Sequence, residues 1–227
     1  MKLLPSYMIN AVLFDLDNTL IDFMAMKREA TRAAAYAMAE AGLKEDRDEL
    51  AKRLFDYYLR YNIESDDAFQ KYLLKEYRTV DYRVLAAAVN AYLAEKAKHM
   101  RPYPGVVETL AELRRRGLKL AVVSDGVRLK AWMRLNAAGL DKYFDTVVTY
   151  EDTGKKKPSK EPFLKACKLL KVLPKECIMV GDWPERDMAG AKAVGMRTCW
   201  AKWGSHVGEG VADFVLDEVG QLLEILE

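Results

Sequence analysis

Residues 11–19 read Ala-Val-Leu-Phe-Asp-Leu-Asp-Asn-Thr, an apolar run that ends in two carboxylates. The run 11–14 is typical of a strand buried on both faces of a parallel sheet. Asp15 and Asp17 follow two residues apart, so in an extended chain their side chains point to the same side. Two carboxylates held together at a dry sheet edge need a cation or a proton between them. The pattern indicates a divalent metal beside a nucleophilic carboxylate, although an Asx-rich turn after a strand would give the same letters.

Three later polar clusters have the same setting as this first one. They are Ser124-Asp125-Gly126 after an apolar run, Lys157-Pro158 in a polar loop, and Gly181-Asp182 followed by Asp187. Each lies at the carboxyl end of a predicted strand or in the loop beyond it. Because that edge of an open α/β sheet is where ligands bind, we expect the clusters to meet in one site.

Taken in order, the four clusters resemble the motifs of the haloacid dehalogenase superfamily, and the resemblance covers almost the whole chain. The matching residues are, in sequence order, Asp15, Asp17 and Thr19; Ser124; Lys157 with Pro158; and Gly181 with Asp182 and Asp187. The resemblance implies an α/β fold, with a Rossmann-like three-layer core on a parallel sheet and a small all-helical cap domain. It also implies a phosphatase that works through an aspartyl-phosphate intermediate.

The apolar pattern after residue 103 alternates between strands and helices. Besides 11–14, strands are predicted at 118–124, 144–149, 177–180, 197–201 and 213–216. Helices are predicted between them, for example at 127–138 and at 187–194. Alternation of this kind favours a parallel sheet with helices on both faces and right-handed crossovers.

Residues 24–100 interrupt this alternation. They contain almost no glycine or proline, and their apolar residues recur at helical spacing, as from Ala30 to Ala41 before Gly42. We expect roughly four helices of ordinary length in this segment. Together with the resemblance, this pattern predicts two domains. They are a core of residues 1–22 and 101–227 and a helical cap of residues 23–100.

The resemblance assigns the chemistry residue by residue. Asp15 would be the nucleophile, and Asp17 would protonate the leaving oxygen and then take a proton from the hydrolytic water. Mg²⁺ would be held by the carboxylates of Asp15 and Asp182 and by the backbone carbonyl of Asp17. Asp187 would orient these ligands or reach the ion through water.

The same resemblance implies a phosphate-binding set. Lys157 would neutralise Asp15 and the transferred phosphoryl group, and the Ser124 hydroxyl would donate a hydrogen bond to phosphate. The backbone at Asp125-Gly126 and at Asn18 would add N–H donors, and Gly126 would permit close approach. Because Asp125 stands where relatives often carry asparagine, its side chain is expected to turn away from phosphate or to accept a backbone hydrogen bond.

Composition argues against several other classes of protein. The 227 residues are 51% hydrophobic and carry a formal net charge of +2 with both signs interleaved, which indicates neither a nucleic-acid nor a membrane partner. No apolar stretch approaches the ~20 residues that cross a bilayer, and the first residues are not a signal peptide. Cys167, Cys177 and Cys199 lack metal-ligand spacing and are expected to be reduced and buried. We expect a cytoplasmic protein, and the resemblance implies a small phosphorylated substrate.

Several alternatives stay open at this point. An acid at position 17 disfavours a dehalogenase, because displacing halide needs no proton, but a phosphomutase and a catalytically silent binding or regulatory module remain alternatives. The sequence assigns neither a particular substrate nor an oligomeric state. His99 is expected as a helix-end cation and His206 as a surface-loop residue. Trp183 is expected either to stiffen the metal-binding loop or to face the cap.

Overall fold

The computed structural model describes residues 8–207 and 210–226. The chain divides into two compact units, one formed by Met1–Asp22 together with Arg101–Glu227 and the other by Phe23–Met100. The second unit is thus inserted into the sequence of the first. Each unit has a hydrophobic core of its own, so each can be described by itself.

The first unit is built on a six-stranded sheet in which all neighbouring strands are parallel, in the order β3-β2-β1-β4-β5-β6. The strands are β1 (Ala11–Phe14), β2 (Lys119–Val123), β3 (Thr146–Val148), β4 (Cys177–Gly181), β5 (Arg197–Ala201) and β6 (Phe214–Leu216). The strands predicted from the sequence are therefore confirmed, with small differences at their ends. All four residues of β1 are buried between its two neighbours, as its apolar run indicated.

The register aligns the carboxyl ends of the central strands. Phe14, the last residue of β1, lies opposite Val122 of β2 and Val180 of β4. The residues that follow these strands therefore emerge at one edge of the sheet. This alignment brings Asp15 and Asp182 to the same edge although they are far apart in the sequence.

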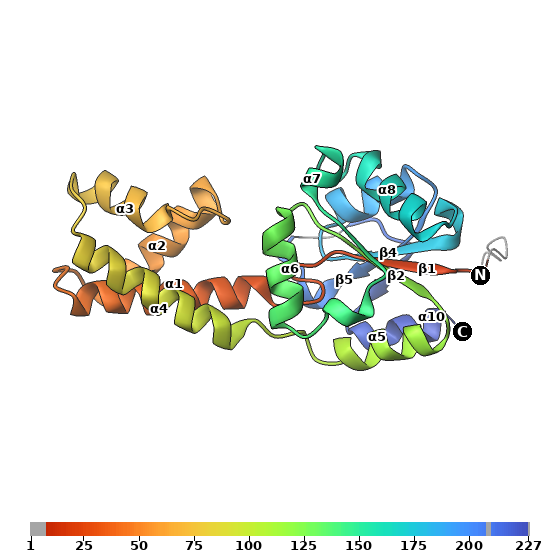
Figure 1. The fold of residues 1–227 in the computed structure, drawn as a ribbon, viewed down its shortest axis with the longest axis horizontal. Helices are drawn as coiled ribbons and strands as arrows, with labels where there is room; N and C mark the ends of the chain where they lie inside the picture. The colour runs from red at the N-terminus through yellow and green to blue at the C-terminus, as the bar shows by residue number, and fades with distance from the viewer. Residues whose placement is uncertain (1–7, 208–209, 227) are drawn as a thin grey trace. The chain divides into compact units, whose positions relative to one another are not determined.

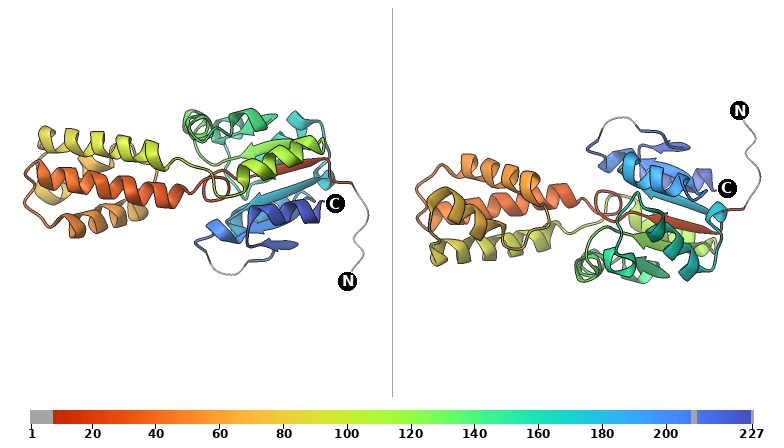
Figure 2. Two further views of the ribbon diagram at one scale, coloured as in Figure 1. Left: turned by 90° about the horizontal axis from the view of Figure 1, so that it is seen from below. Right: turned by 90° about the horizontal axis from the view of Figure 1, so that it is seen from above.

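Helices cover both faces of this sheet (Figures 1 and 2). They are α5 (Val106–Arg115), α6 (Arg128–Ala137), α7 (Tyr150–Thr153), α8 (Lys160–Leu170), α9 (Ala189–Lys192) and α10 (Leu222–Ile225). Short 3₁₀ segments join them: η1 (Asp141–Tyr143), η2 (Pro174–Glu176), η4 (Lys202–Gly204) and η5 (Val219–Gln221). Figure 1 shows α7 and α8 on one face and α5 and α10 on the other. On the α8 face, Phe163 is buried in one cluster with Leu13 and Met179.

The helix predicted at 187–194 begins earlier than expected, at Pro184, and ends at Lys192. The chain forms a π-helical turn, η3 (Pro184–Met188), before α9 begins. Pro184 has no N–H and a fixed φ, which suits the first helical turn. The amide of Asp187 donates to the carbonyl of Trp183 at 2.8 Å. The earlier start places Asp187 inside the turn rather than at the beginning of the helix.

The second unit is all helical, as the spacing of its apolar residues indicated. Its helices are α1 (Phe23–Glu40), α2 (Arg47–Tyr61), α3 (Ala68–Tyr77) and α4 (Tyr82–His99). All four contribute to its core, which includes Ala34, Leu54, Tyr72 and Ala88. Among the described residues, no helix combines the length and the apolar character needed to cross a membrane.

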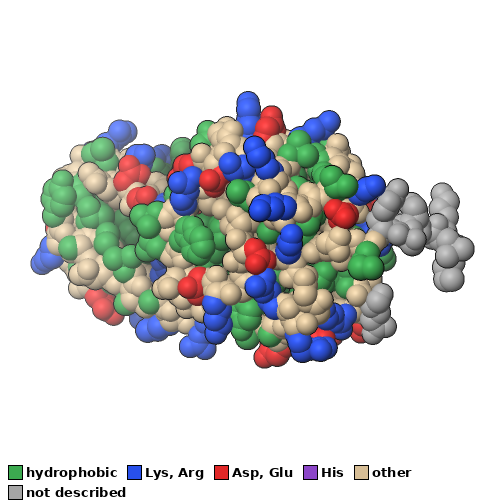
Figure 3. All heavy atoms as spheres, turned by 45° about the vertical axis from the view of Figure 1, so that its right-hand side comes forward, with side chains coloured by type: hydrophobic (Ala, Val, Ile, Leu, Met, Phe, Trp, Pro, Cys, Tyr) green, Lys and Arg blue, Asp and Glu red, His purple; other side chains and the backbone are tan. Residues whose placement is uncertain are grey.

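Charged side chains of both signs are mixed on the surface. On the face drawn in Figure 3, Lys and Arg side chains are interspersed with Asp and Glu. Elsewhere in the described residues, opposite charges form ion pairs, such as Arg114 with Asp145 at 2.6 Å. This face therefore lacks the continuous basic stripe that is typical of a nucleic-acid interface.

Candidate active site

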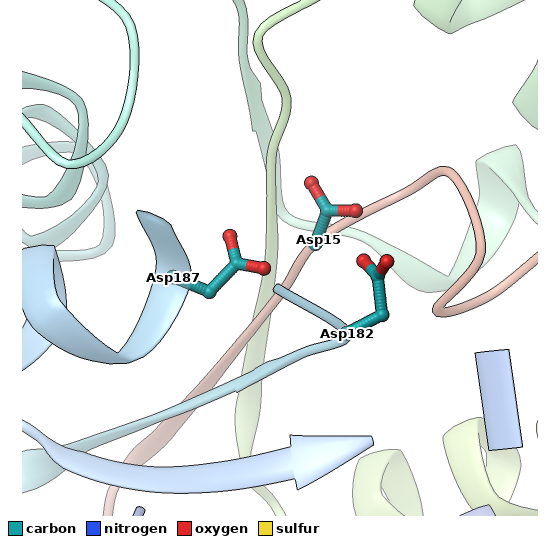
Figure 4. A group of neighbouring side chains, drawn as sticks. All are labelled: Asp15, Asp182 and Asp187. Atoms are coloured by element: carbon teal, nitrogen blue, oxygen red, sulfur yellow. The ribbon is translucent and has the colours of Figure 1, made fainter. Parts of the chain in front are cut away.

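Three carboxylates meet beyond the carboxyl ends of β1 and β4. Asp15 directly follows β1, Asp182 directly follows β4, and Asp187 lies in η3. One oxygen from each carboxylate lies within 4.8 Å of the others, and Figure 4 shows the three side chains converging from separate segments. All three residues are at most 9% exposed. Like charges packed this closely in a buried site favour a bound cation.

Lys157 supplies a positive charge to this cluster. Its ammonium contacts Oδ1 of Asp15 and lies 2.6 Å from Oδ1 of Asp187, and its side chain is 2% exposed. Burial disfavours the ammonium, but the charges of Asp15 and Asp187 outweigh burial and hold the pKa of Lys157 above its usual range. Lys157 therefore stays charged and joins the strand end carrying Asp15 to the turn carrying Asp187.

The site disfavours the ionised form of the Asp182 carboxylate. Burial first, and then the charges of Asp15 and Asp187, raise the pKa of Asp182 to about 8. The Thr19 hydroxyl donates to Oδ1 of Asp182 at 3.3 Å, which orients the carboxylate. A divalent cation would reverse this destabilisation of the charged form, because it attracts ionised carboxylates. The donor set therefore fits a hard, oxygen-seeking ion such as Mg²⁺.

Asp187 is held by two groups at once. Oδ1 pairs with the Lys157 ammonium, and Oδ2 accepts the backbone N–H of Trp183 at 3.0 Å. Burial raises the pKa of Asp187, while the Lys157 charge opposes that effect. A side chain at Gly181 would collide with Asp187, since its Cβ would lie 2.4 Å from Oδ2. Because both carboxylate oxygens of Asp187 already have partners, Asp187 is suited to orienting its neighbours.

The Asp17 side chain is placed apart from this cluster. Its Oδ2 lies 2.5 Å from Nη1 of Arg134, a residue of α6 whose side chain is only 4% exposed. Arg134 lies outside the four sequence motifs and was not predicted as a site residue. A signal was present, because Arg134 lies on the inward stripe of α6 with Ala131 and Leu135, where an apolar residue is the normal choice.

The loop after β2 is arranged around Ser124 and Asp125. The Ser124 hydroxyl oxygen accepts the N–H of Gly126 at 3.1 Å. Oδ1 of Asp125 accepts the backbone N–H of Lys157 at 2.8 Å, and Oδ2 pairs with the guanidinium of Arg186. The Asp125 carboxylate therefore accepts a backbone hydrogen bond, as the sequence analysis expected of it.

Asn18 lies in a tight turn after β1. Its backbone is left-handed, with φ of 62°. Its amide, one of the donors expected for phosphate, instead donates to the carbonyl of Ile21 at 2.7 Å. The Asn18 N–H thus already has a backbone acceptor, and a phosphate donor at Asn18 stays a prediction. Gly204 packs against the same turn, where a Cβ would lie 1.6 Å from the Asn18 carbonyl oxygen.

The structure shows the surroundings of three aromatic side chains whose roles the sequence left open. The ring of Trp183 lies 4.7 Å from the guanidinium carbon of Arg186, beside the acidic cluster. His99 is the last residue of α4 and pairs with Glu95 at 3.0 Å. His206 is exposed in the loop after η4. Of these three, Trp183 has its backbone joined to the acidic cluster, through its N–H and Asp187.

Comparison with known proteins gives one family. The family model of haloacid dehalogenase-like hydrolases matches residues 9–195. The glyceraldehyde 3-phosphate phosphatase from Methanopyrus kandleri is 35% identical to this chain, over 96% of this chain and 97% of its own length. The glyceraldehyde 3-phosphate phosphatase from Pyrococcus furiosus is 34% identical, over 96% of this chain and 93% of its own length. The solved haloacid dehalogenase (HAD) phosphatase from Thermococcus onnurineus is 28% identical, with a TM-score of 0.64 over 96% of this chain and 97% of that one. This chain therefore belongs to the haloacid dehalogenase-like hydrolases and is a phosphatase.

Proposed function

We propose that this phosphatase depends on Mg²⁺ and hydrolyses a small phosphorylated metabolite, with glyceraldehyde 3-phosphate as the first candidate. The substrate is suggested by the names of the two similar phosphatases. The observation that carries the proposal is the convergence of Asp15, Asp182 and Asp187 beside the buried Lys157 ammonium. A carboxylate nucleophile, a metal site and a phosphate-neutralising cation would then lie together.

The charge balance of the site supports a divalent ion. The carboxylates of Asp15, Asp17, Asp182 and Asp187 face two cationic side chains, Lys157 and Arg134. Their formal sum is two negative charges, which one Mg²⁺ would cancel. Carboxylates of Asp15 and Asp182 with the Asp17 carbonyl would hold the ion, and Asp187 would orient them. When bound, Mg²⁺ would supply positive charge to the phosphoryl oxygens.

Asp15 is the proposed nucleophile. Lys157 fixes the orientation of the Asp15 carboxylate through Oδ1 and stays charged during attack on phosphorus. The Asp15–phosphorus bond forms as the bond to the ester oxygen breaks, which leaves an aspartyl-phosphate and an alcohol. Ser124, at the end of the neighbouring strand β2, would donate its hydroxyl to the phosphoryl group.

Asp17 is the proposed acid and base. It would give a proton to the departing ester oxygen and then remove one from the water that attacks the aspartyl-phosphate. Hydrolysis returns Asp15 as a carboxylate and releases inorganic phosphate. Asp17 suits this role because its side chain lies outside the acidic cluster and is held by a separate contact to Arg134.

We also propose that the helical unit Phe23–Met100 acts as a cap that selects the substrate. Its insertion between the segment carrying Asp15 and the segment carrying Ser124 supports this role. We further propose that the enzyme works in the cytoplasm, where its cysteines would remain thiols. Cys167, Cys177 and Cys199 are all free and buried, in keeping with a reducing compartment.

The test is phosphate release by the purified enzyme from glyceraldehyde 3-phosphate, glycerol 3-phosphate and 2-phosphoglycolate. Activity is expected with Mg²⁺ and is expected to disappear after chelation with EDTA and return on adding Mg²⁺. Asp15→Asn should abolish turnover with an unchanged circular dichroism spectrum. The matched control is Asp217→Asn, which changes an exposed carboxylate of the same unit and should leave turnover unchanged.

Each part of the proposal has its own contrary result. Undiminished turnover after chelation would rule out the metal. Activity in Asp15→Asn would remove Asp15 as nucleophile. Acid quenching of the wild-type enzyme, followed by borohydride reduction, should convert Asp15 to homoserine through its acyl phosphate. If another of the three esters has a much higher kcat/KM, that ester becomes the candidate substrate in place of glyceraldehyde 3-phosphate.

A further inference from the structure

We propose that Arg134 is a positioning residue that holds the Asp17 carboxylate in place for proton transfer to and from the reacting oxygens. The inference rests on the proposed role of Asp17 and extends it to a residue outside the four sequence motifs. Its basis is the contact between Nη1 of Arg134 and Oδ2 of Asp17 at 2.5 Å.

Arg134 is buried in a place that normally takes an apolar side chain. It is 3% exposed and lies on the inward stripe of α6 beside Ala131 and Leu135. An arginine stays charged inside a protein, and a buried charge is costly unless it is paired. Leucine or methionine would suit the core better at this position. The ion pair with Asp17 therefore points to a use other than packing.

Arg134 also lies against the loop predicted to bind phosphate. A Cβ at Gly126 would be 3.6 Å from Nη1 of Arg134 and 3.3 Å from Oγ of Ser124. The same Nη1 thus lies close to that loop and in contact with Asp17. Because Arg134 comes from a helix and not from a loop, it gives Asp17 a fixed support at the edge of the phosphate site.

Asp15 and Asp17 are held by different cationic side chains. Asp15 is held by Lys157, whereas Asp17 is held by Arg134, and the Asp17 side chain is not part of the acidic cluster among the described residues. A planar guanidinium restricts a carboxylate more than a point charge does. Arg134 would thereby hold Asp17 clear of the metal ligands, where it can meet the ester oxygen.

This role predicts a dependence on the leaving group. Glyceraldehyde 3-phosphate releases an alkoxide that needs a proton, whereas p-nitrophenyl phosphate releases a stable phenolate. Arg134→Gln is expected to lower the single-turnover rate of aspartyl-phosphate formation about 30-fold with glyceraldehyde 3-phosphate, a part of what a general acid contributes, and less than about threefold with p-nitrophenyl phosphate. The later hydrolysis of the aspartyl-phosphate, in which Asp17 is the proposed base, should slow equally with both esters. KM should change little on either substrate, and Arg134→Lys should recover part of the lost kcat.

The matched control is Arg128→Gln, on the same helix, which removes an exposed arginine paired with Asp152. It should leave kcat on both esters unchanged. Equal losses in the rate of aspartyl-phosphate formation from the two esters in Arg134→Gln would overturn the inference, as would an unchanged rate with glyceraldehyde 3-phosphate.

A double-mutant cycle with Asp17→Asn tests whether Arg134 acts through Asp17. If it does, adding Arg134→Gln to Asp17→Asn should change kcat less than about twofold, and the two effects on the urea midpoint should also be non-additive. Additive losses in both measurements would overturn the inference. Full activity of Asp17→Asn is a separate result, which would refute the proposed role of Asp17 itself, and the unfolding cycle would still report the Arg134–Asp17 contact.

Discussion

The carboxylate of Asp125 accepts the backbone N–H of Lys157 at 2.8 Å, across a sequence separation of 32 residues. This contact explains how an acidic residue is tolerated beside the proposed site for phosphate. One oxygen is occupied by the Lys157 amide and the other by the Arg186 guanidinium, so the charge is balanced locally. The same contact fixes the backbone that carries the Lys157 ammonium.

Asp125→Ala is therefore expected to impair catalysis through Lys157. The buried Lys157 amide would lose its acceptor, at a cost of about 1–3 kcal/mol in the free energy of unfolding, and kcat should fall about tenfold. Asp125→Asn keeps an amide oxygen that can accept the same hydrogen bond, so its kcat should lie much nearer the wild type. Steady-state kinetics and urea unfolding of both variants provide the check. An asparagine variant as impaired as the alanine variant would contradict this explanation.

Gly181→Ala should damage the site with a smaller effect on the fold. The new Cβ would lie 2.4 Å from Oδ2 and 2.5 Å from Cγ of Asp187, so the Asp187 side chain must move away from Lys157 and Trp183. A displacement of this size is expected to lower kcat by about 100-fold. The control is Gly220→Ala, because nothing lies within 4 Å of a Cβ at Gly220. Wild-type kcat in Gly181→Ala would show that the position of Asp187 does not matter.

Lys157→Met should affect both stability and activity. The ammonium lies between Asp15 and Asp187, and removing it leaves those buried carboxylates uncompensated. The metal-free protein is expected to lose about 3–5 kcal/mol of unfolding free energy, measured by urea denaturation, and to have no detectable phosphatase activity. Lys155→Met, an exposed lysine of the same loop, should behave as wild type. A fully active Lys157→Met protein would contradict the assigned role.

The stability of the metal-free protein should depend on the ionisation of Asp182. Its pKa is raised to about 8 in the fold, whereas an unfolded aspartate has a pKa of about 3.9. Between these values the folded chain binds more protons than the unfolded chain, so the contribution of Asp182 to stability falls as pH rises. Mg²⁺ binds the ionised carboxylate, so the increase in Tm that it causes should be small at low pH and grow towards pH 8.

Thermal melts with and without Mg²⁺ across this pH range provide the measurement. In Asp182→Asn the group that titrates is gone, and the increase in Tm caused by Mg²⁺ should be small at every pH. An increase in wild-type Tm that is the same at low pH and at pH 8 would contradict the assignment of Asp182.

The sequence predicted the strands well because buried strands are local apolar runs. The run 11–14 and the run 177–180 both match strands of the structure, and the polar residues after them lie at the carboxyl edge of one sheet. The π-helical turn from Pro184 to Met188 was not predicted, since it is stabilised by the Trp183 carbonyl and by Asp187 rather than by apolar spacing. A turn of this kind has no periodic signal.

The contacts between residues far apart in the chain could not be predicted from the sequence either, because they leave no periodic signal in it. Arg134 lies 117 residues from Asp17, and nothing local in either segment specifies the pairing. The position of Arg134 on an apolar helical stripe indicated that it is buried, but it did not indicate which residue pairs with it. Likewise, the donation of the Asn18 amide to Ile21 depends on a left-handed turn, which asparagine adopts more readily than most residues but which the sequence does not require.

The parallel α/β core, the inserted helices and the acidic and basic residues of the four motifs could be predicted from the sequence, because periodicity and residue chemistry are properties of the chain itself. The pairing of charges could not: Lys157 meets Asp15 and Asp187, and Arg134 meets Asp17, only in the folded chain. Ion pairs depend on distances through space, and those distances exist only after the sheet register and the surrounding turns have formed.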